Sequence, residues 1–135
     1  MIRYALLVLV LIGAWFVGSP GALAQTSKTG RADFMGREKK LELWHWYRTS
    51  GAECIGRHEG GWTSNTGNGF YGRFQANVQF YTGYGRHYGK HISYARRYGS
   101  ADNWPRVLQI HMALHGYNAR GWYPWLYTAR ICGLL

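Results

Sequence analysis

A single carboxylate stands within a stretch of glycines, aromatic rings and uncharged polar side chains. The stretch covers residues 58–75, HEGGWTSNTGNGFYGRFQ, and the carboxylate is Glu59. Acids are scarce in the whole chain, with 6 Asp and Glu against 16 Lys and Arg. A carboxyl group in such surroundings can donate and accept protons in catalysis. Glu59 is therefore the first candidate for a catalytic acid, and the alternative is a solvated acid at a helix end.

No evident second carboxylate serves the same site. Ordinary glycosidases use a pair of carboxylates, but Glu53 should point well away from Glu59 on a shared helix, and Asp102 fits a helix cap. A reaction with one acid fits better, because the acid can protonate the leaving oxygen while a hydroxyl of the substrate replaces water as the nucleophile. The sequence therefore favours intramolecular cleavage of a glycoside over ordinary hydrolysis.

The residues that follow Glu59 are of types that bind sugars. Aromatic rings offer a flat apolar surface to a sugar ring, and hydroxyl and amide groups offer hydrogen bonds. The predicted substrate-binding residues are Trp62, Thr66, Asn68, Tyr71 and Gln75. The alternative for each of them is an ordinary structural role in the core, in a turn or at a helix cap.

Metal chemistry has less support in the sequence. His111 and His115 lie four residues apart, as do His87 and His91, and histidines at this spacing can bind zinc from one face of a helix. The HEGGW segment does not match the His-Glu-x-x-His zinc motif, because Trp62 stands where the second histidine belongs. We therefore expect no metal and no cofactor, and interpret these histidines as packed or solvated.

Four helices are predicted to position the site. Hydrophobic residues at helical spacing, together with cap and stop signals, indicate helices at 34–47, 52–59, 91–98 and 105–115. A glycine pair would end the second helix directly after Glu59. Asp33 and Asn77 are predicted caps, and the last helix is expected to be central because it is apolar on several faces.

The glycine-rich segment after the second helix has a different pattern. Asn68-Gly69 is a strong hairpin signal, because both residue types tolerate positive φ angles. We expect a short β-hairpin or a glycine-rich extended loop beside the site. The predicted fold class is therefore α+β, mainly α, in a single domain.

The first 24 residues have the layout of a secretory signal peptide. Arg3 is followed by an apolar run over residues 4–17 and then by the small-residue pattern Ala22-Leu23-Ala24. The run is shorter than the roughly 20 residues that a membrane-spanning helix needs. We expect cleavage after Ala24, export, and no stable insertion into a membrane.

The exported part is strongly basic. Arg3 is the only charged side chain in the first 24 residues, so 16 minus 1 leaves 15 Lys and Arg against 6 acids, a net charge of +9 with neutral histidines. Such a chain should associate with anionic polymers, for example those of a cell wall. Nucleic acid is not an expected partner, because the basic residues are scattered and no nucleic-acid-binding motif is present.

Two cysteines, Cys54 and Cys132, complete the candidate residues. An even number of cysteines in an exported chain predicts a disulfide bond. Such a bond would close a long loop and stabilise the fold by roughly 4 kcal/mol. The alternative is two free thiols.

Residues 54–75, CIGRHEGGWTSNTGNGFYGRFQ, resemble the central motif of the resuscitation-promoting-factor and related transglycosylase-like domains of actinobacteria, within the lysozyme-like superfamily. The shared pattern is a Cys before a Glu, then Gly-Gly and Trp, Asn-Thr-Gly-Asn-Gly, an aromatic-Tyr-Gly and a Gln. The end of the chain is also similar, with Trp122, Trp125 and Cys132. The resemblance covers residues 52–135 and leaves a lead-in segment, 25–51, outside it.

This resemblance implies a compact lysozyme-like domain with a small β-hairpin beside the cleft. It implies cleavage of peptidoglycan between N-acetylmuramic acid and N-acetylglucosamine, with Glu59 as the catalytic acid. Sugar contacts are implied for Thr66, Tyr71 and Gln75, and a family disulfide for the two cysteines. The resulting hypothesis is a secreted, wall-associated monomer that acts on peptidoglycan glycan strands as a lytic transglycosylase.

The motif departs from the family pattern in its spacing and at two positions. In resuscitation factors the Cys lies directly before the Glu, whereas Cys54 lies five residues before Glu59, and their segment between the Glu and the Trp is two residues longer. Gly60 stands where resuscitation factors have a Ser, and Arg73 stands where the family usually has a small residue. Two alternatives therefore stay open. One is a non-catalytic peptidoglycan-binding module, and the other is a lysozyme-type hydrolase that uses the same Glu59.

Overall fold

The computed structural model of the protein describes residues 35–82 and 89–135. All of them belong to one compact unit, Asp33–Leu135, which includes the second half of the lead-in segment. The predicted signal peptide at 1–24, the predicted cap Asp33 and the histidine His87 lie outside the described residues.

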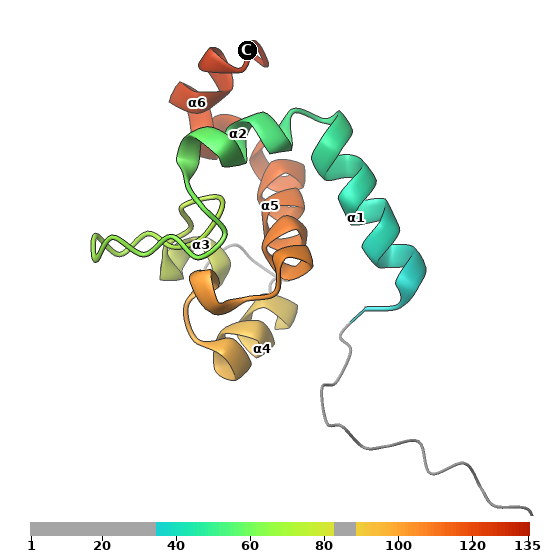
Figure 1. Ribbon diagram of the computed structural model, residues 1–135, viewed down its shortest axis with the longest axis vertical. Helices are drawn as coiled ribbons and strands as arrows, with labels where there is room; N and C mark the ends of the chain where they lie inside the picture. The colour runs from blue at the N-terminus through green and yellow to red at the C-terminus, as the bar shows by residue number, and fades with distance from the viewer. Residues whose placement is uncertain (1–34, 83–88) are drawn as a thin grey trace, which may run out of the picture. The chain divides into compact units, whose positions relative to one another are not determined.

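The described part of the chain is mainly helical, as predicted (Figure 1). No β-strand is found within residues 35–82 and 89–135. The elements follow in the order α1 (Arg37–Thr49), α2 (Ala52–Glu59), α3 (Val78–Thr82), α4 (Gly89–Tyr98), η2 (Ala101–Asn103), α5 (Arg106–Arg120), η3 (Tyr123–Trp125) and α6 (Leu126–Ile131).

The predicted helices correspond to α1, α2, α4 and α5. The bounds predicted for α2 are confirmed, because the chain leaves the helix at Gly60, whose N–H still bonds to the carbonyl of Gly56. The predicted cap at Asn77 is also confirmed, since its Oδ1 accepts a hydrogen bond of 2.7 Å from the N–H of Phe80 in α3. The predicted end of α5, residue 115, is wrong by five residues, because the helix continues through Gly116 to Arg120. Gly116 does not end the helix but allows close packing, since a Cβ there would lie 2.5 Å from the Phe80 ring.

The core gathers around α5, which lies at the centre of the unit in Figure 1. α1 packs against α5 and α2, and α2 packs against α6. The largest fully buried side chains come from every part of the unit and are Tyr94, Phe74, Leu43, Ile55, Ile110, Met112, His91 and Gln109. The helix that carries Glu59 at its end, α2, thus packs against both α1 and α6.

The segment between α2 and α3 projects from the helices as a doubled-back loop (Figure 1). It contains two isolated antiparallel bridges, Asn65–Tyr71 and Tyr71–Ala76, in place of the regular strands of the predicted hairpin. The side chains of Asn65 and Asn68 accept hydrogen bonds from the N–H groups of Gly67 and Phe70. These local turns compete with ladder pairing, so the glycine-rich extended loop describes the segment better.

A buried side chain of α5 anchors this loop. Gln109 Nε2 donates hydrogen bonds to the carbonyls of Trp62 (2.9 Å) and Trp104 (3.0 Å), and Gln109 Oε1 accepts one from the N–H of Arg73 (2.8 Å). Gly72 allows this approach, since its φ is +70° and a Cβ there would lie 2.5 Å from Gln109 Oε1. The loop is therefore fixed to the central helix.

The predicted disulfide is confirmed. Cys54 in α2 is bonded to Cys132, which directly follows α6, across 78 residues of sequence. Within residues 35–82 and 89–135, none of the helices has the length and apolar character needed to cross a membrane.

Candidate functional site

Glu59 is the last residue of α2 and lies half-buried beside a pocket of about 580 Å³. The other described residues that line this pocket carry amide, aromatic and proline side chains. They are Asn68, Phe70, Phe74, Gln75, Asn77, Gln79, Phe80, Pro124 and Trp125. Glu59 thus faces a cavity with the volume of a small-molecule site, and it is the only carboxylate in the described lining.

The carboxyl group of Glu59 has a specific partner 69 residues along the chain. The buried hydroxyl of Thr128 in α6 donates a hydrogen bond to Glu59 Oε1. Within the described residues no hydrogen bond reaches Oε2, which leaves that oxygen available to a ligand. A group fixed through one oxygen and open at the other can exchange a proton with a bound substrate.

Three of the four remaining carboxylate side chains in residues 35–82 and 89–135 are engaged elsewhere, and the fourth, Glu38, lies in the first turn of α1. Glu42 pairs with Lys39 (2.8 Å), and Glu53 pairs with Arg57 (2.9 Å). Asp102 Oδ2 accepts a hydrogen bond of 3.3 Å from Asn65. None of these acids lines the Glu59 pocket. The site therefore offers one acid, as the sequence suggested.

Two of the five predicted substrate-binding residues join Glu59 at the pocket, and both have amide side chains. Asn68 is exposed in the projecting loop, and Gln75 is half-buried near the base of that loop. Gln75 has a φ of +46°, a left-handed conformation that is costly for a residue with a side chain. Its Nε2 donates a 3.0 Å hydrogen bond to the carbonyl of Gly72. Backbone conformations of this kind cluster at functional sites.

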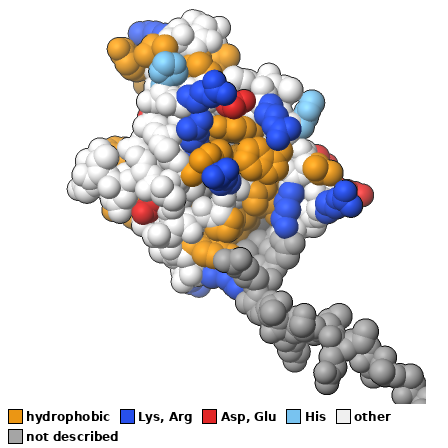
Figure 2. Space-filling model, viewed as in Figure 1, with side chains coloured by type: hydrophobic (Ala, Val, Ile, Leu, Met, Phe, Trp, Pro, Cys, Tyr) orange, Lys and Arg blue, Asp and Glu red, His pale blue; other side chains and the backbone are white. Residues whose placement is uncertain are grey.

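The structure places Trp62 outside the lining of the pocket, in an aromatic cluster. Its ring lies 6.0 Å from that of Trp44 and 5.5 Å from that of Tyr47, measured between ring centroids. The guanidinium groups of Arg73 and Arg106 lie 5.3 Å and 5.6 Å from the Trp62 ring centroid. Figure 2 shows apolar side chains gathered between Lys and Arg side chains on one face of the unit.

The other two predicted substrate-binding residues also lie outside the lining. Thr66 is exposed at the tip of the loop. Tyr71 is half-buried, and its backbone pairs with that of Ala76. Tyr71 packs against the hydrophobic core as a partly buried residue. Burial raises the pKa of the Tyr81 hydroxyl, and nearby Tyr71 and Asp102 raise it further.

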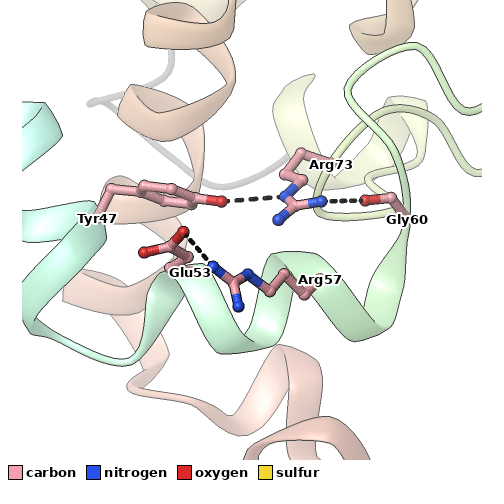
Figure 3. A network of polar contacts seen from close by, with 5 residues as sticks. All are labelled: Tyr47, Glu53, Arg57, Gly60 and Arg73. Atoms are coloured by element: carbon pink, nitrogen blue, oxygen red, sulfur yellow. Dashed lines mark hydrogen bonds and ion pairs between the residues drawn. The ribbon is translucent and has the colours of Figure 1, made fainter.

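Arg73, one of the two departures from the family pattern, links three parts of the unit. Its Nε donates a hydrogen bond to the Tyr47 hydroxyl (3.0 Å), and another of its nitrogens donates to the Gly60 carbonyl (3.0 Å), as Figure 3 shows. The Glu53–Arg57 pair lies nearby along α2. Arg73 therefore connects α1 to the residue that follows the catalytic candidate, and it does not line the pocket.

Gly60, the other departure, is required by space. Its φ of 178° is extended and suits any residue. However, a Cβ at this position would lie 2.9 Å from Gln75 Nε2 and 3.0 Å from the Gly72 carbonyl oxygen. The absence of a side chain thus lets Gln75 approach the end of α2.

Several residues that line the pocket or contact Glu59 escaped the sequence reasoning. Thr128 was missed because nothing in its local sequence marks a hydroxyl that faces a carboxylate 69 residues away. Phe80 and Pro124 were missed for the same reason, since both reach the pocket through long-range packing. Trp125, already noted in the family resemblance, is 5% exposed, and its indole N–H donates to the Phe74 carbonyl.

No family model, no curated protein and no solved structure matches this chain.

Proposed function

We propose that this protein is a secreted lytic transglycosylase with a lysozyme-like domain. Its substrate would be peptidoglycan, cleaved at the β-1,4 bond between N-acetylmuramic acid and N-acetylglucosamine. The observation that carries the proposal is that Glu59 is the single carboxylate lining a 580 Å³ pocket in the described residues, next to Asn68 and Gln75 of the resembling motif. The roles of Trp62, Thr66 and Tyr71 in sugar binding stay predictions.

The proposed reaction uses Glu59 twice. In its protonated form Glu59 donates its proton to the glycosidic oxygen while the bond between that oxygen and C1 of N-acetylmuramic acid breaks. The carboxylate then accepts the proton of the C6 hydroxyl of the same sugar, whose oxygen bonds to C1. The products are a free 4-hydroxyl and a 1,6-anhydro ring, and no water is consumed. The internal nucleophile needs only correct orientation, which the pocket would supply.

The two departures from the family pattern do not argue against activity. Gly60 and Arg73 both support the position of the α2 end and of Gln75 through packing and hydrogen bonds. The basic surface would favour association with anionic wall polymers. The disulfide between Cys54 and Cys132 suits an exported protein.

Mass spectrometry of digested, purified peptidoglycan tests the proposal. We expect 1,6-anhydro ends from the wild type, and a loss of at least roughly 10²-fold in Glu59→Gln. Glu53→Gln is the matched control, because Glu53 lies on the same helix outside the pocket lining and should keep full activity.

Three other results of this experiment would lead to different conclusions. Reducing ends would indicate a lysozyme-type hydrolase that uses the same glutamate. Retention on wall material without any cleavage would indicate a binding module. Full activity in Glu59→Gln would refute the assignment of the catalytic acid.

A further inference from the structure

Three histidines from two helices meet at a place that the proposed reaction does not use. His91 lies on α4, and His111 and His115 lie one turn apart on α5. Their potential ligand nitrogens all lie within 4.8 Å of one another. His91 is fully buried, His111 is 5% exposed, and His115 is half-buried and therefore reachable from solvent. None of the three lines the pocket at Glu59.

The rings already face one another closely. His91 Nε2 lies 2.7 Å from His115 Nδ1, and the ring centroids of His111 and His115 are 4.3 Å apart. The two nitrogens at 2.7 Å share a proton in this arrangement. The Tyr94 hydroxyl lies 3.2 Å from His111 Nδ1.

We propose that His91, His111 and His115 form a site for one transition-metal ion, of which Zn²⁺ is the best fit. Three imidazoles match the ligand set of zinc sites with an open fourth position. Imidazole nitrogens suit Zn²⁺, Cu²⁺ and Ni²⁺, whereas Ca²⁺ and Mg²⁺ require oxygen ligands. Tyr94 would orient the His111 ring through its outer nitrogen, as partners of metal-bound histidines commonly do.

The His91–His115 pair needs little adjustment for binding, and the His111 ligand nitrogen already lies within 4.8 Å of both. In tetrahedral coordination with Zn–N bonds of 2.0–2.1 Å, neighbouring ligand nitrogens lie about 3.3 Å apart. The His91 and His115 nitrogens would therefore separate by about 0.6 Å, which a side-chain rotation supplies, and the shared proton would leave. The bound ion would join α4 to the central helix α5.

The second cluster of potential metal ligands in the described residues does not support a metal site. Cys54, His58 and Cys132 also bring their side chains together, but both cysteines are consumed by the disulfide and offer no thiolate. The histidine site stands independently of the proposed transglycosylase activity, since no residue is shared with the Glu59 pocket.

Titration of the chelator-treated, full exported chain with ZnCl₂ tests the site by calorimetry and by thermal unfolding. We expect one Zn²⁺ per chain with a Kd of roughly micromolar or below, and a rise in Tm of roughly 10 °C at about 100 times Kd. Co²⁺ should give the visible absorption of a tetrahedral nitrogen site. Mg²⁺ should produce no effect.

His115→Ala is the informative variant because His115 is half-buried, and His45→Ala, an exposed histidine of α1, is the control. His115→Ala should lose the Tm response and bind at least roughly tenfold more weakly, and His45→Ala should respond like the wild type. His91→Gln offers a second variant that keeps a polar side chain. No Tm response in the wild type, an equal response to Mg²⁺, or an unchanged response in both His115→Ala and His91→Gln would overturn the proposal.

Discussion

The hydroxyl of Thr128 fixes the one carboxylate of the site. It donates to Glu59 Oε1 from a buried position, so removal of the hydroxyl should change the orientation of the acid. Thr128→Val keeps the shape and removes the donor. We expect kcat on soluble glycan fragments to fall by roughly tenfold or more, with little change in KM.

Thr128→Ser is the matched control for this prediction. It restores the hydroxyl, so it should recover most of the activity even though a methyl group is lost from the core. Equal activities of the Val and Ser variants would mean that Thr128 acts through packing alone.

Gln75 combines a strained backbone with a side chain that reaches the pocket. A left-handed φ of +46° costs roughly 1–2 kcal/mol for a residue with a Cβ and nothing for glycine. Gln75→Gly should therefore be more stable than Gln75→Ala by about 1 kcal/mol in urea unfolding. Both variants should lose substrate affinity, because both lack the amide that lines the pocket.

The two measurements on Gln75 separate strain from function. If the Ala variant is as stable as the Gly variant, the backbone is not strained. If both variants keep the wild-type KM, the amide does not contact the substrate.

At the scale of elements, the end of α2 depends on the missing side chain of Gly60. Gly60→Ser would place a Cβ 2.9 Å from Gln75 Nε2 and 3.0 Å from the Gly72 carbonyl oxygen. One neighbour is backbone and cannot move easily, so we expect a loss of about 1–3 kcal/mol in the free energy of unfolding. A serine at this position, as in the resuscitation factors that the motif resembles, should thus destabilise this protein.

Gly61→Ser provides the control for this comparison. A Cβ at Gly61 would have nothing within 4 Å, so this variant should change stability by less than about 0.5 kcal/mol. Equal losses in the two variants, measured by urea unfolding, would contradict the packing argument.

The elements also show which features were predictable from sequence. The bounds of α2 and the cap at Asn77 followed from local signals, a glycine pair and an amide side chain that bonds three residues ahead. The sequence signal at Asn68-Gly69 favoured a short β-hairpin with regular strands, which the structure does not contain in this described segment. Local hydrogen bonds to asparagine side chains replace the regular hydrogen bonds between strands, and the sequence did not reveal this.

Contacts between distant segments were beyond sequence reasoning. The pairing of Glu59 with Thr128, and the meeting of His91 with His111 and His115, depend on how helices pack. The four-residue spacing of His111 and His115 was visible, but the third histidine comes from another helix. The placement of Trp62 away from the pocket likewise follows from the Trp44 and Tyr47 rings that surround it.

At the scale of the whole molecule, the buried tyrosine Tyr81 makes the free energy of unfolding depend on pH in the alkaline range. Burial first, and then Tyr71 and Asp102, raise the pKa of Tyr81 in the folded state above its ordinary value of 10.0. The folded state holds this proton more tightly than the unfolded state. Its stabilising effect is therefore complete below about pH 10 and is lost as the pH rises through the folded pKa.

Urea unfolding at pH 8 and at pH 11 measures this effect. We expect the free energy of unfolding to be lower at pH 11, and we expect a smaller decrease in Tyr81→Phe. Tyr127→Phe is the control, because Tyr127 is 79% exposed and its removal should leave the wild-type decrease unchanged. The same decrease in all three proteins would exclude Tyr81 as its source.

The disulfide joins the two helices that carry the site. Cys54 lies in α2 with Glu59, and Cys132 directly follows α6, which carries Thr128. Closing a loop across 78 residues should contribute about 4.5 kcal/mol in the chain-entropy account. The paired substitution Cys54→Ala and Cys132→Ala should lower the free energy of unfolding by about this amount.

The disulfide should also increase the proposed catalytic activity under conditions where the protein stays folded. Without the disulfide, α2 and α6 are held by side-chain packing and by the hydrogen bond between Thr128 and Glu59, so that hydrogen bond should form less often. Activity of the paired alanine variant, measured well below its Tm, should therefore fall more than in a control destabilised elsewhere to the same extent, such as Leu43→Ala in α1. Equal activities at equal stability would show that the disulfide stabilises the unit without aligning the acid.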